Sequence, residues 1–184
     1  MGDPLGETLE LVIPTESIHA RLDQLARDIR RDFAGKDLVV VGVLRASFIF
    51  LADLIRRLDL PLRLDFLSAG SYGDGTTPRQ PVVVDGGSAA DVQGRDCLLV
   101  DAVLDSGRTL AAVRQHLLDF APRSLAVCVL LVKEGAQQVE VPVEYVGFWA
   151  PNRFLVGYGL DYAQRYRNLP YLAALRPQGT GEAP

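Results

Sequence analysis

The segment DSGRT, residues 105–109, has the composition of a site that binds a small anion. It follows the apolar run CLLVDAVL and precedes a helical pattern, so it connects a strand to a helix. Backbone N–H groups and the positive end of a helix dipole meet at such a turn and favour phosphate. Ser106 and Thr109 add hydroxyl donors, and Gly107 allows a ligand to approach the backbone closely. The same residue types can also serve only to cap the helix, so the segment alone leaves both interpretations open.

Polar residues also stand at the ends of three predicted strands. These residues are Arg45, Asp101 and Lys133. The carboxyl ends of parallel strands lie along one edge of a sheet, where ligands of such folds bind. These three residues are therefore candidates for contact with a ligand. The motifs GxxxxGK[ST] and GxGxxG do not occur in the chain, which excludes a Walker loop and the dinucleotide fingerprint.

The elements that would position these residues alternate between helix and strand. The spacing of apolar residues predicts helices over 15–35, 47–58 and 109–120. Apolar runs predict strands over 38–44, 62–70, 96–102 and 124–132, followed by two more over 144–150 and 154–160. This alternation predicts an α/β fold with a mostly parallel sheet flanked by helices.

The chain is expected to form one domain over residues 15–175. Residues 1–14 are expected to be a loosely held N-terminal arm, and residues 176–184 a disordered tail. The segment from Ser71 to Ala90 holds many turn-forming residues, and long segments of this kind are usually functional or mobile.

Composition excludes several classes of protein. The chain has 184 residues and a net charge of −4, which gives no electrostatic reason to expect nucleic acid as a partner. Neither a secretion signal nor an apolar run long enough to span a membrane is visible. Cys97 and Cys128 lie inside apolar runs and are expected to be buried, reduced thiols. These observations predict a cytoplasmic protein without a membrane partner.

Several separated motifs resemble one known family. Residues 101–110, DAVLDSGRTL, resemble the phosphoribosyl diphosphate signature of the type I phosphoribosyltransferases. The segments VLRASFIFLADL, VLLVK and VGFWAPNRFLVGYGLDYAQRYRNLP resemble, in this order, further blocks of the hypoxanthine-guanine phosphoribosyltransferases. The resemblance runs from about Ile18 to Leu175. It implies the type I fold, with a small hood region and a flexible loop beside the central sheet.

The resemblance also implies a reaction in purine salvage. The enzyme would transfer the phosphoribosyl group of phosphoribosyl diphosphate to hypoxanthine or guanine, giving IMP or GMP and pyrophosphate. The transition state resembles an oxocarbenium ion with a departing dianion. Catalysis then needs an anchor for the 5′-phosphate, Mg²⁺ on the pyrophosphate and a group that handles the proton at purine N7. A homodimer or homotetramer is implied as well.

Each matched position carries an implied role. The 5′-phosphate would bind Asp105, Ser106, Gly107, Arg108 and Thr109. Asp105 would also be the catalytic residue, exchanging a proton with N7. Asp101 would bind the ribose and, together with Asp161, the metal.

The purine and the pyrophosphate would contact other parts of the chain. Lys133 would donate to purine O6, Phe154 would stack on the ring, and the backbone of Leu155 would contact the base edge. The pyrophosphate would bind Arg45, Ala46 and Arg167, with a cis peptide bond between Leu44 and Arg45. The flexible loop, entered through Ser71 and Tyr72, would close over the site as a lid and exclude water.

One position departs from the family pattern. Where the family has Glu-Asp, this chain has Asp101-Ala102, so the first acid is shorter and the second is missing. Each lost charge-assisted hydrogen bond would cost ~1.5–3 kcal/mol, so we expect a less efficient enzyme that Ala102→Asp would improve. Two alternatives stay open. The chain could be a catalytically weakened homologue that acts as a purine-nucleotide-binding or regulatory protein. It could also be a transferase that prefers another 6-oxopurine such as xanthine.

Overall fold

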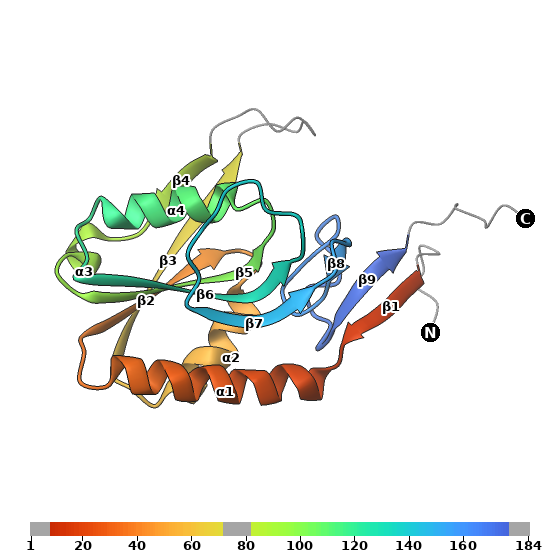
Figure 1. Cartoon of the computed structure of the whole chain (residues 1–184), viewed down its shortest axis with the longest axis horizontal. Coiled ribbons are helices and arrows are strands. Elements are labelled where there is room, and N and C mark those ends of the chain that lie inside the picture. The colour runs from red at the N-terminus through yellow and green to blue at the C-terminus, as the bar shows by residue number, and fades with distance from the viewer. Residues whose placement is uncertain (1–7, 72–81, 177–184) are drawn as a thin grey trace, which may run out of the picture.

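The centre of the molecule is a six-stranded sheet with the strand order β4-β3-β2-β5-β6-β7 (Figure 1). This computed structural model describes residues 8–71 and 82–176. The strands are β2 (Leu38–Leu44), β3 (Leu62–Ser71), β4 (Val82–Gly86), β5 (Asp96–Leu104), β6 (Ser124–Lys133) and β7 (Tyr145–Ala150). All neighbouring strands are parallel except β4, which runs antiparallel to β3. The expected mostly parallel sheet is confirmed.

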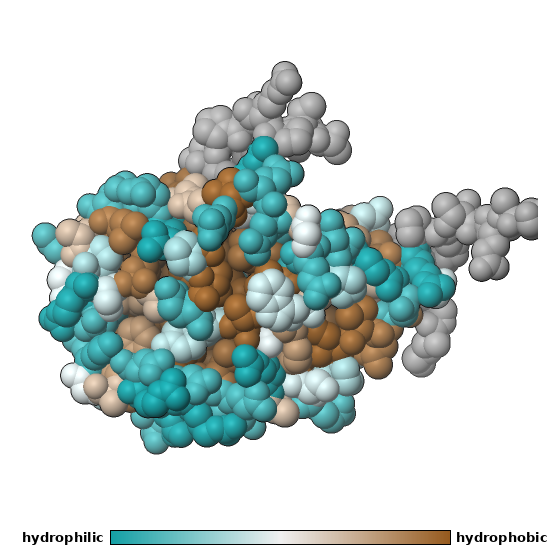
Figure 2. All heavy atoms as spheres, viewed as in Figure 1, coloured by the Kyte–Doolittle hydropathy of each residue, from teal (hydrophilic) through white to brown (hydrophobic). Residues whose placement is uncertain are grey.

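Helices cover both faces of this sheet. Figure 1 shows α1 (Thr15–Phe33) and α2 (Phe48–Leu58) on one face, and α4 (Arg108–Leu118) with the short α3 (Ala89–Val92) on the other. The three predicted helices agree with α1, α2 and α4 to within about two residues, whereas α3 was not predicted. Hydrophilic residues gather along the lower rim of Figure 2, where α1 faces solvent. Among the described residues, no helix is long and apolar enough to cross a membrane.

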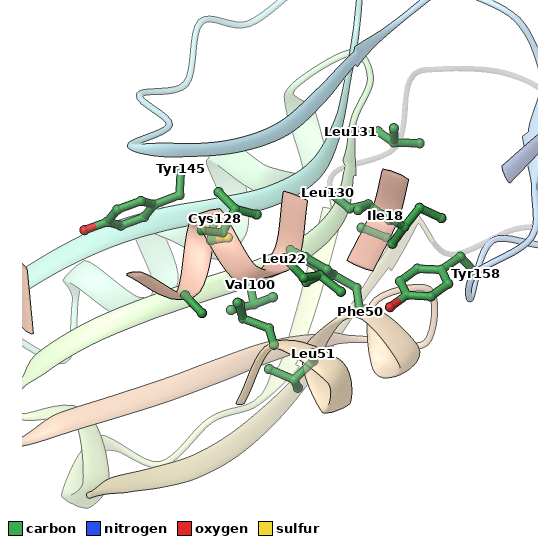
Figure 3. Packing of buried hydrophobic residues seen from close by; sticks show 14 of the residues in the cluster. Ile18, Leu22, Phe50, Leu51, Val100, Cys128, Leu130, Leu131, Tyr145 and Tyr158 are labelled. Carbon is green, nitrogen blue, oxygen red and sulfur yellow. The ribbon is translucent and has the colours of Figure 1, made fainter. Parts of the chain in front are cut away.

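The two faces of the sheet carry separate apolar cores. The core under α1 and α2 includes Ile18, Leu22, Phe50, Val100 and Leu130 (Figure 3), while the core under α4 includes Val41, Leu99, Leu110, Val113 and Val129. Alternation along each strand sends successive side chains to opposite cores, which is why the strands are continuously apolar. Cys97 and Cys128 are buried free thiols, as predicted.

A second, three-stranded sheet stands beside the central one. It has the order β1-β9-β8, formed by β1 (Thr8–Ile13), β9 (Leu172–Arg176) and β8 (Leu155–Val156), all antiparallel.

The small sheet corrects two sequence expectations. Residues 8–13 are a strand and not part of a loose arm, because they pair with a segment about 160 residues further along the chain. The predicted strand over 154–160 is limited to Leu155–Val156. Pairing partners so distant in sequence leave no local pattern. Residues 1–7 and 177–184 lie outside the described residues, so the arm and the tail stay predictions there.

Candidate active site

A cleft of about 930 Å³ lies at the carboxyl ends of β2 and β5. These strands are neighbours at the centre of the sheet, and the chain leaves β2 toward β3 on one side and β5 toward β6 on the other. Ligands of α/β sheets bind at such a reversal of strand order. The walls come from the turn after β2, the turn after β5, the ends of β3 and β4, and a C-terminal turn that carries Asp161 and Arg167.

The turn between β5 and α4 has the geometry expected of an anion site. Ser106, Gly107 and Thr109 line the cleft, and α4 begins at Arg108. Gly107 has φ +83°, and a Cβ there would lie 2.2 Å from the backbone oxygen of Val139, so the turn requires glycine. The N–H groups in the first turn of a helix lack intrahelical partners, which makes them available to a phosphate.

Asp105 faces Lys133 and does not cap α4. The Nζ atom of Lys133 donates to Oδ2 of Asp105 at 2.6 Å, and the N-cap residue of α4 is Gly107, with no side-chain cap hydrogen bond. Lys133 has only 14% of its side chain exposed, whereas Asp105 has 51%. Capping therefore does not explain Asp105. The pair instead places a cation and a carboxylate side by side at the ends of two adjacent strands.

Asp101 lies at the floor of the cleft, and its relative exposure is 8%. The backbone N–H of Ala102 donates to Oδ1 of Asp101 at 2.7 Å. Burial raises the pKa of the Asp101 carboxyl to about 7, although hydrogen bonds from the backbone of Ala102 and Val103 oppose this shift. A carboxyl with such a pKa can be either protonated or charged near neutral pH.

Ala102 faces the other way. Its relative exposure is 0%, it packs in the core under α1 and α2, and it is not among the cleft-lining residues. Adjacent strand residues point to opposite faces, so the acid missing at this position would have pointed into the apolar core. This burial argues against the expectation that Ala102→Asp would improve catalysis, because the new carboxylate would lie away from the ligand space.

Arg45 and Ala46 line the cleft opposite the anion turn. The peptide bond between Leu44 and Arg45 is cis, as the resemblance implies. The buried hydroxyl of Ser47 donates to the carbonyl oxygen of Val43 at 2.6 Å and thereby holds the turn against the end of β2. The guanidinium of Arg45 is on an exposed residue, where it can reach an anion in the cleft.

Asp161 and Arg167 meet on the third wall of the cleft. Nη2 of Arg167 lies 2.7 Å from Oδ1 of Asp161, and Nη1 donates to the backbone oxygen of Gly159 at 2.7 Å. Oδ2 of Asp161 accepts from the backbone N–H of Gln164 at 2.9 Å. The two residues expected to serve the metal and the pyrophosphate are thus held by one turn.

The two residues expected at the purine ring and edge sit at the small sheet. Phe154 is 51% exposed, and its ring meets Tyr162 edge-on with centroids 5.5 Å apart. Leu155 is buried in β8, where it pairs with Ala174 of β9. The exposed face of an aromatic ring can accept a planar base by stacking.

Some expected residues lie elsewhere. Arg108 is exposed at the start of α4 and is not among the cleft-lining residues. The three residues expected at the purine do not line the cleft either: Lys133, Phe154 and Leu155. Ser71 ends β3 and pairs with Val82 of β4, so the base of the expected flexible loop is a hairpin. Tyr72 and the rest of the segment 72–81 lie outside the described residues.

Sequence reasoning missed two contributions to the site. Ser68, Ala69, Gly70, Val84 and Asp85 of the hairpin line the cleft. The end of β3 is a strand end like those of β2 and β5, and the same argument could have found it. The other contribution is a support for the anion turn, because the backbone N–H groups of Gln138 and Val139 donate to the carbonyl oxygen of Ser106 at 2.9 and 3.0 Å. Such a contact between loops leaves no local signal.

The cleft fits a magnesium ion that arrives with a diphosphate. Within residues 8–71 and 82–176, no three His, Cys, Asp or Glu side chains are grouped so that they could hold a metal ion. Asp101 and Asp161 nevertheless line the same cleft from two walls. Mg²⁺ commonly takes one or two carboxylates and completes its shell with water and substrate phosphates. The residues present suit that mode and not a metal held by protein alone.

Comparisons with known proteins agree with this geometry. The model of the phosphoribosyl transferase domain matches residues 14–163. A hypoxanthine phosphoribosyltransferase from Salmonella typhimurium is 46% identical over 167 residues, which cover 90% of this chain and 94% of that protein. One from Haemophilus influenzae is 42% identical, covering 89% of this chain and 93% of that protein.

Solved structures lead to the same class. A hypoxanthine-guanine phosphoribosyltransferase from Bacillus anthracis superposes with a TM-score of 0.84 at 36% identity, covering 92% of this chain and 99% of that one. The chain therefore belongs to the phosphoribosyl transferase domain family and has the fold of its type I members. Within that family it groups with the hypoxanthine and hypoxanthine-guanine phosphoribosyltransferases, so the resemblance stated from the sequence is confirmed.

Proposed function

We propose that this phosphoribosyltransferase joins hypoxanthine or guanine to phosphoribosyl diphosphate, giving IMP or GMP and pyrophosphate. The observation that carries the proposal is the contact between Lys133 and Asp105, at 2.6 Å, beside the anion turn. A donor for an exocyclic oxygen and an acceptor for a ring N–H thereby stand next to a phosphate site. A 6-oxopurine base with a proton on N7 and the phosphoribosyl group that it attacks present these three features together.

On the purine side, Lys133 donates to O6 and Asp105 exchanges the proton at N7. Adenine has an amino group at this position, which cannot accept a hydrogen bond, so the Lys133 ammonium would face another donor and lose the hydrogen bond that O6 provides. Phe154 stacks on the ring, and the backbone of Leu155 contacts the base edge. A carboxylate within hydrogen-bond reach of N7 contributes ~10²–10⁴-fold to the rate as a proton acceptor or donor.

On the sugar-phosphate side, the turn 105–109 anchors the 5′-phosphate and Asp101 binds the ribose hydroxyls. Arg45, the backbone at Ala46 and Arg167 bind the diphosphate. A bound Mg²⁺ supplies charge neutralisation on the leaving pyrophosphate, and Asp101 and Asp161 are the carboxylates that would hold it. Holding both substrates in line removes much of the entropic barrier to their reaction.

The proposal includes a lid over the cleft. The segment that begins at Ser71 and Tyr72 closes as this lid and excludes water during the reaction. The antiparallel hairpin of β3 and β4 supports this, because it places both ends of that segment at the mouth of the cleft. We also propose a cytoplasmic enzyme that works as a homodimer or homotetramer.

A panel of bases tests the proposal directly. Purified protein with phosphoribosyl diphosphate and Mg²⁺ is given hypoxanthine, guanine, xanthine or adenine, and nucleotide formation is followed. We expect product from hypoxanthine and guanine. A preference for adenine would contradict the role of Lys133, and a Lys133→Met variant should lose the discrimination between oxo and amino purines.

A second candidate function is a purine-nucleotide-binding protein with little turnover. The buried Asp101 favours it, because burial raises the pKa of this carboxyl to about 7 and the ribose side is then only partly ionised at neutral pH. Measurable binding of IMP or GMP without product from any base would support this candidate. Product from xanthine alone would indicate the other alternative, a transferase for a different 6-oxopurine.

A further inference from the structure

Glu10 is the centre of a three-residue ion cluster that joins β1 and β9 to the turn that precedes Phe154. Arg153 donates through Nη1 to Oε1 of Glu10 at 3.1 Å and through Nη2 to Oε2 at 2.9 Å. Arg176 donates to Oε2 through Nε at 2.9 Å and Nη2 at 2.7 Å. The hydrogen bonds from Arg153 and Arg176 lower the pKa of the Glu10 carboxyl to about 2. Glu10 therefore stays charged at any physiological pH.

Arg153 immediately precedes Phe154, the ring expected to stack on the purine. The backbone around it turns tightly, since the N–H of Arg153 donates to the carbonyl oxygen of Pro151 at 2.7 Å. The carbonyl oxygen of Phe154 accepts from the N–H of Leu175, and the next residue pairs with Ala174 of β9. Glu10 pairs with the same Ala174 from the opposite edge of β9. The small sheet thus fixes one side of the turn and the Glu10–Arg153 contact fixes the other.

Phe154 depends on this backbone because its side chain is not held in a core. Half of the residue is exposed, and its described ring contact is the edge of Tyr162. Loss of the Glu10 charge would leave Arg153 and Arg176 as like charges without their shared partner. The Arg153 side chain would then no longer be held beside β1, and the turn that orients Phe154 would become more mobile.

We propose that Glu10 is a positioning residue for Phe154, the ring proposed to stack on the purine. It acts through Arg153 on the backbone that carries Phe154. The inference rests on the proposed purine site. The part that concerns the turn around Phe154 can be tested by hydrogen exchange, which does not require an active enzyme. The strand that holds Glu10 lies outside residues 14–163, over which the family domain matches.

The test compares Glu10→Gln with Arg176→Gln in the full-length protein. Arg176 shares the same carboxylate through its side chain, and its substitution leaves the backbone hydrogen bond from Leu175 to Phe154 in place, so it is a matched control for the loss of one ion pair. In Glu10→Gln we expect faster amide hydrogen exchange over residues 152–156 and a KM for hypoxanthine raised about five- to tenfold. The KM for phosphoribosyl diphosphate and kcat should stay within about twofold, and Arg176→Gln should change none of these.

Two further variants separate positioning from general stability. Adding Glu10→Gln to Arg153→Gln should produce no additional rise in the hypoxanthine KM, because both changes break one contact. Arg153→Lys keeps the charge and should give an intermediate effect. Equal effects of Glu10→Gln and Arg176→Gln, a parallel rise of both KM values, or unchanged exchange over 152–156 would each overturn the inference. If the wild-type protein makes no nucleotide, the proposed function fails, and the exchange comparison alone decides whether Glu10 positions the turn.

Discussion

Asp105 and Lys133 form an ion pair that a 6-oxopurine would have to share. The pair places a proton acceptor for N7 and a donor for O6 on neighbouring strands, β5 and β6, whose residues stay in register from Asp96 to Leu104. In the structure each of the two charged groups is the hydrogen-bond partner of the other. A bound base would accept from the lysine and donate to the carboxylate, so neither charge would be left unpaired.

This arrangement predicts a large effect of Asp105→Asn on the rate. An amide at this position cannot accept the N7 proton, so we expect kcat to fall by about 10²–10⁴-fold. Asp119→Asn at the exposed end of α4 is a suitable control and should leave kcat unchanged. Steady-state rates with hypoxanthine measure both. A loss of less than about tenfold in Asp105→Asn would show that the proton is handled elsewhere.

Asp101 predicts a specific dependence of stability on pH. Its pKa is about 7 in the folded protein against an ordinary value of 3.8, so the folded state holds the proton more tightly than the unfolded chain. The free energy of unfolding should therefore fall as pH rises from about 4 to about 7, by up to a few kcal/mol, and level off above that range.

The Asp101→Asn variant isolates this contribution. It should lack that part of the decline, so its Tm relative to the wild type should rise between pH 5 and pH 8. Thermal unfolding across this range gives the comparison. Parallel Tm curves for the two proteins would mean that Asp101 is not perturbed by burial.

Ala102 gives a prediction of opposite sign to the one suggested by sequence. Because its side chain is fully buried in an apolar core, Ala102→Asp should destabilise the fold by several kcal/mol. Ala102→Ser, which adds one neutral polar group, should cost markedly less. Denaturant unfolding measures both. A variant with unchanged stability and higher kcat/KM would restore the original expectation that the position serves the ribose.

At the scale of elements, the anion turn depends on three segments that are not adjacent in sequence. β5 delivers the chain to the turn, α4 begins at Arg108, and the backbone N–H groups of Gln138 and Val139 bond to Ser106 from a loop after β6. That loop also closes over Gly107, where an added Cβ would meet the carbonyl oxygen of Val139. Contacts with residues 138 and 139 therefore fix the conformation of the turn without a bound phosphate.

Gly107→Ala tests this packing. The added methyl group would be too close to a backbone atom, and φ +83° is unfavourable for alanine, so the turn would have to shift. We expect phosphoribosyl diphosphate and IMP to bind at least tenfold more weakly, with a loss of ~1–3 kcal/mol in stability. Gly94→Ala, at another positive φ but with no atom within 4 Å of the added Cβ, controls for backbone strain alone. Equal losses of ligand affinity in the two variants would contradict the account.

At the scale of the whole molecule, local patterns in the sequence predicted the central sheet well. The runs that became β2, β5 and β6 are continuously apolar because both faces of the sheet are covered, and that burial is visible in composition. The polar residues at the ends of these strands indicated the edge where the cleft lies. Of these residues, Arg45 and Asp101 line the cleft, and Lys133 does not line it but contacts Asp105, which does.

Contacts between distant segments could not be predicted in this way. β1 and β9 pair across most of the chain, and Glu10 meets Arg153 and Arg176 only because they do. The side of the sheet to which Ala102 points also depends on register, since a one-residue shift would exchange the two faces. These features arise when the sheets assemble, and residue types alone do not encode them visibly.

The central claim is that residues 105–109 hold the 5′-phosphate while Lys133 and Asp105 hold the purine. A crystal structure of the protein with IMP or GMP tests it most directly. We expect the phosphate against the backbone N–H groups of 106–109, O6 within hydrogen-bond distance of Lys133 Nζ, and N7 facing Asp105. A nucleotide bound elsewhere, with the turn 105–109 empty, would contradict the account.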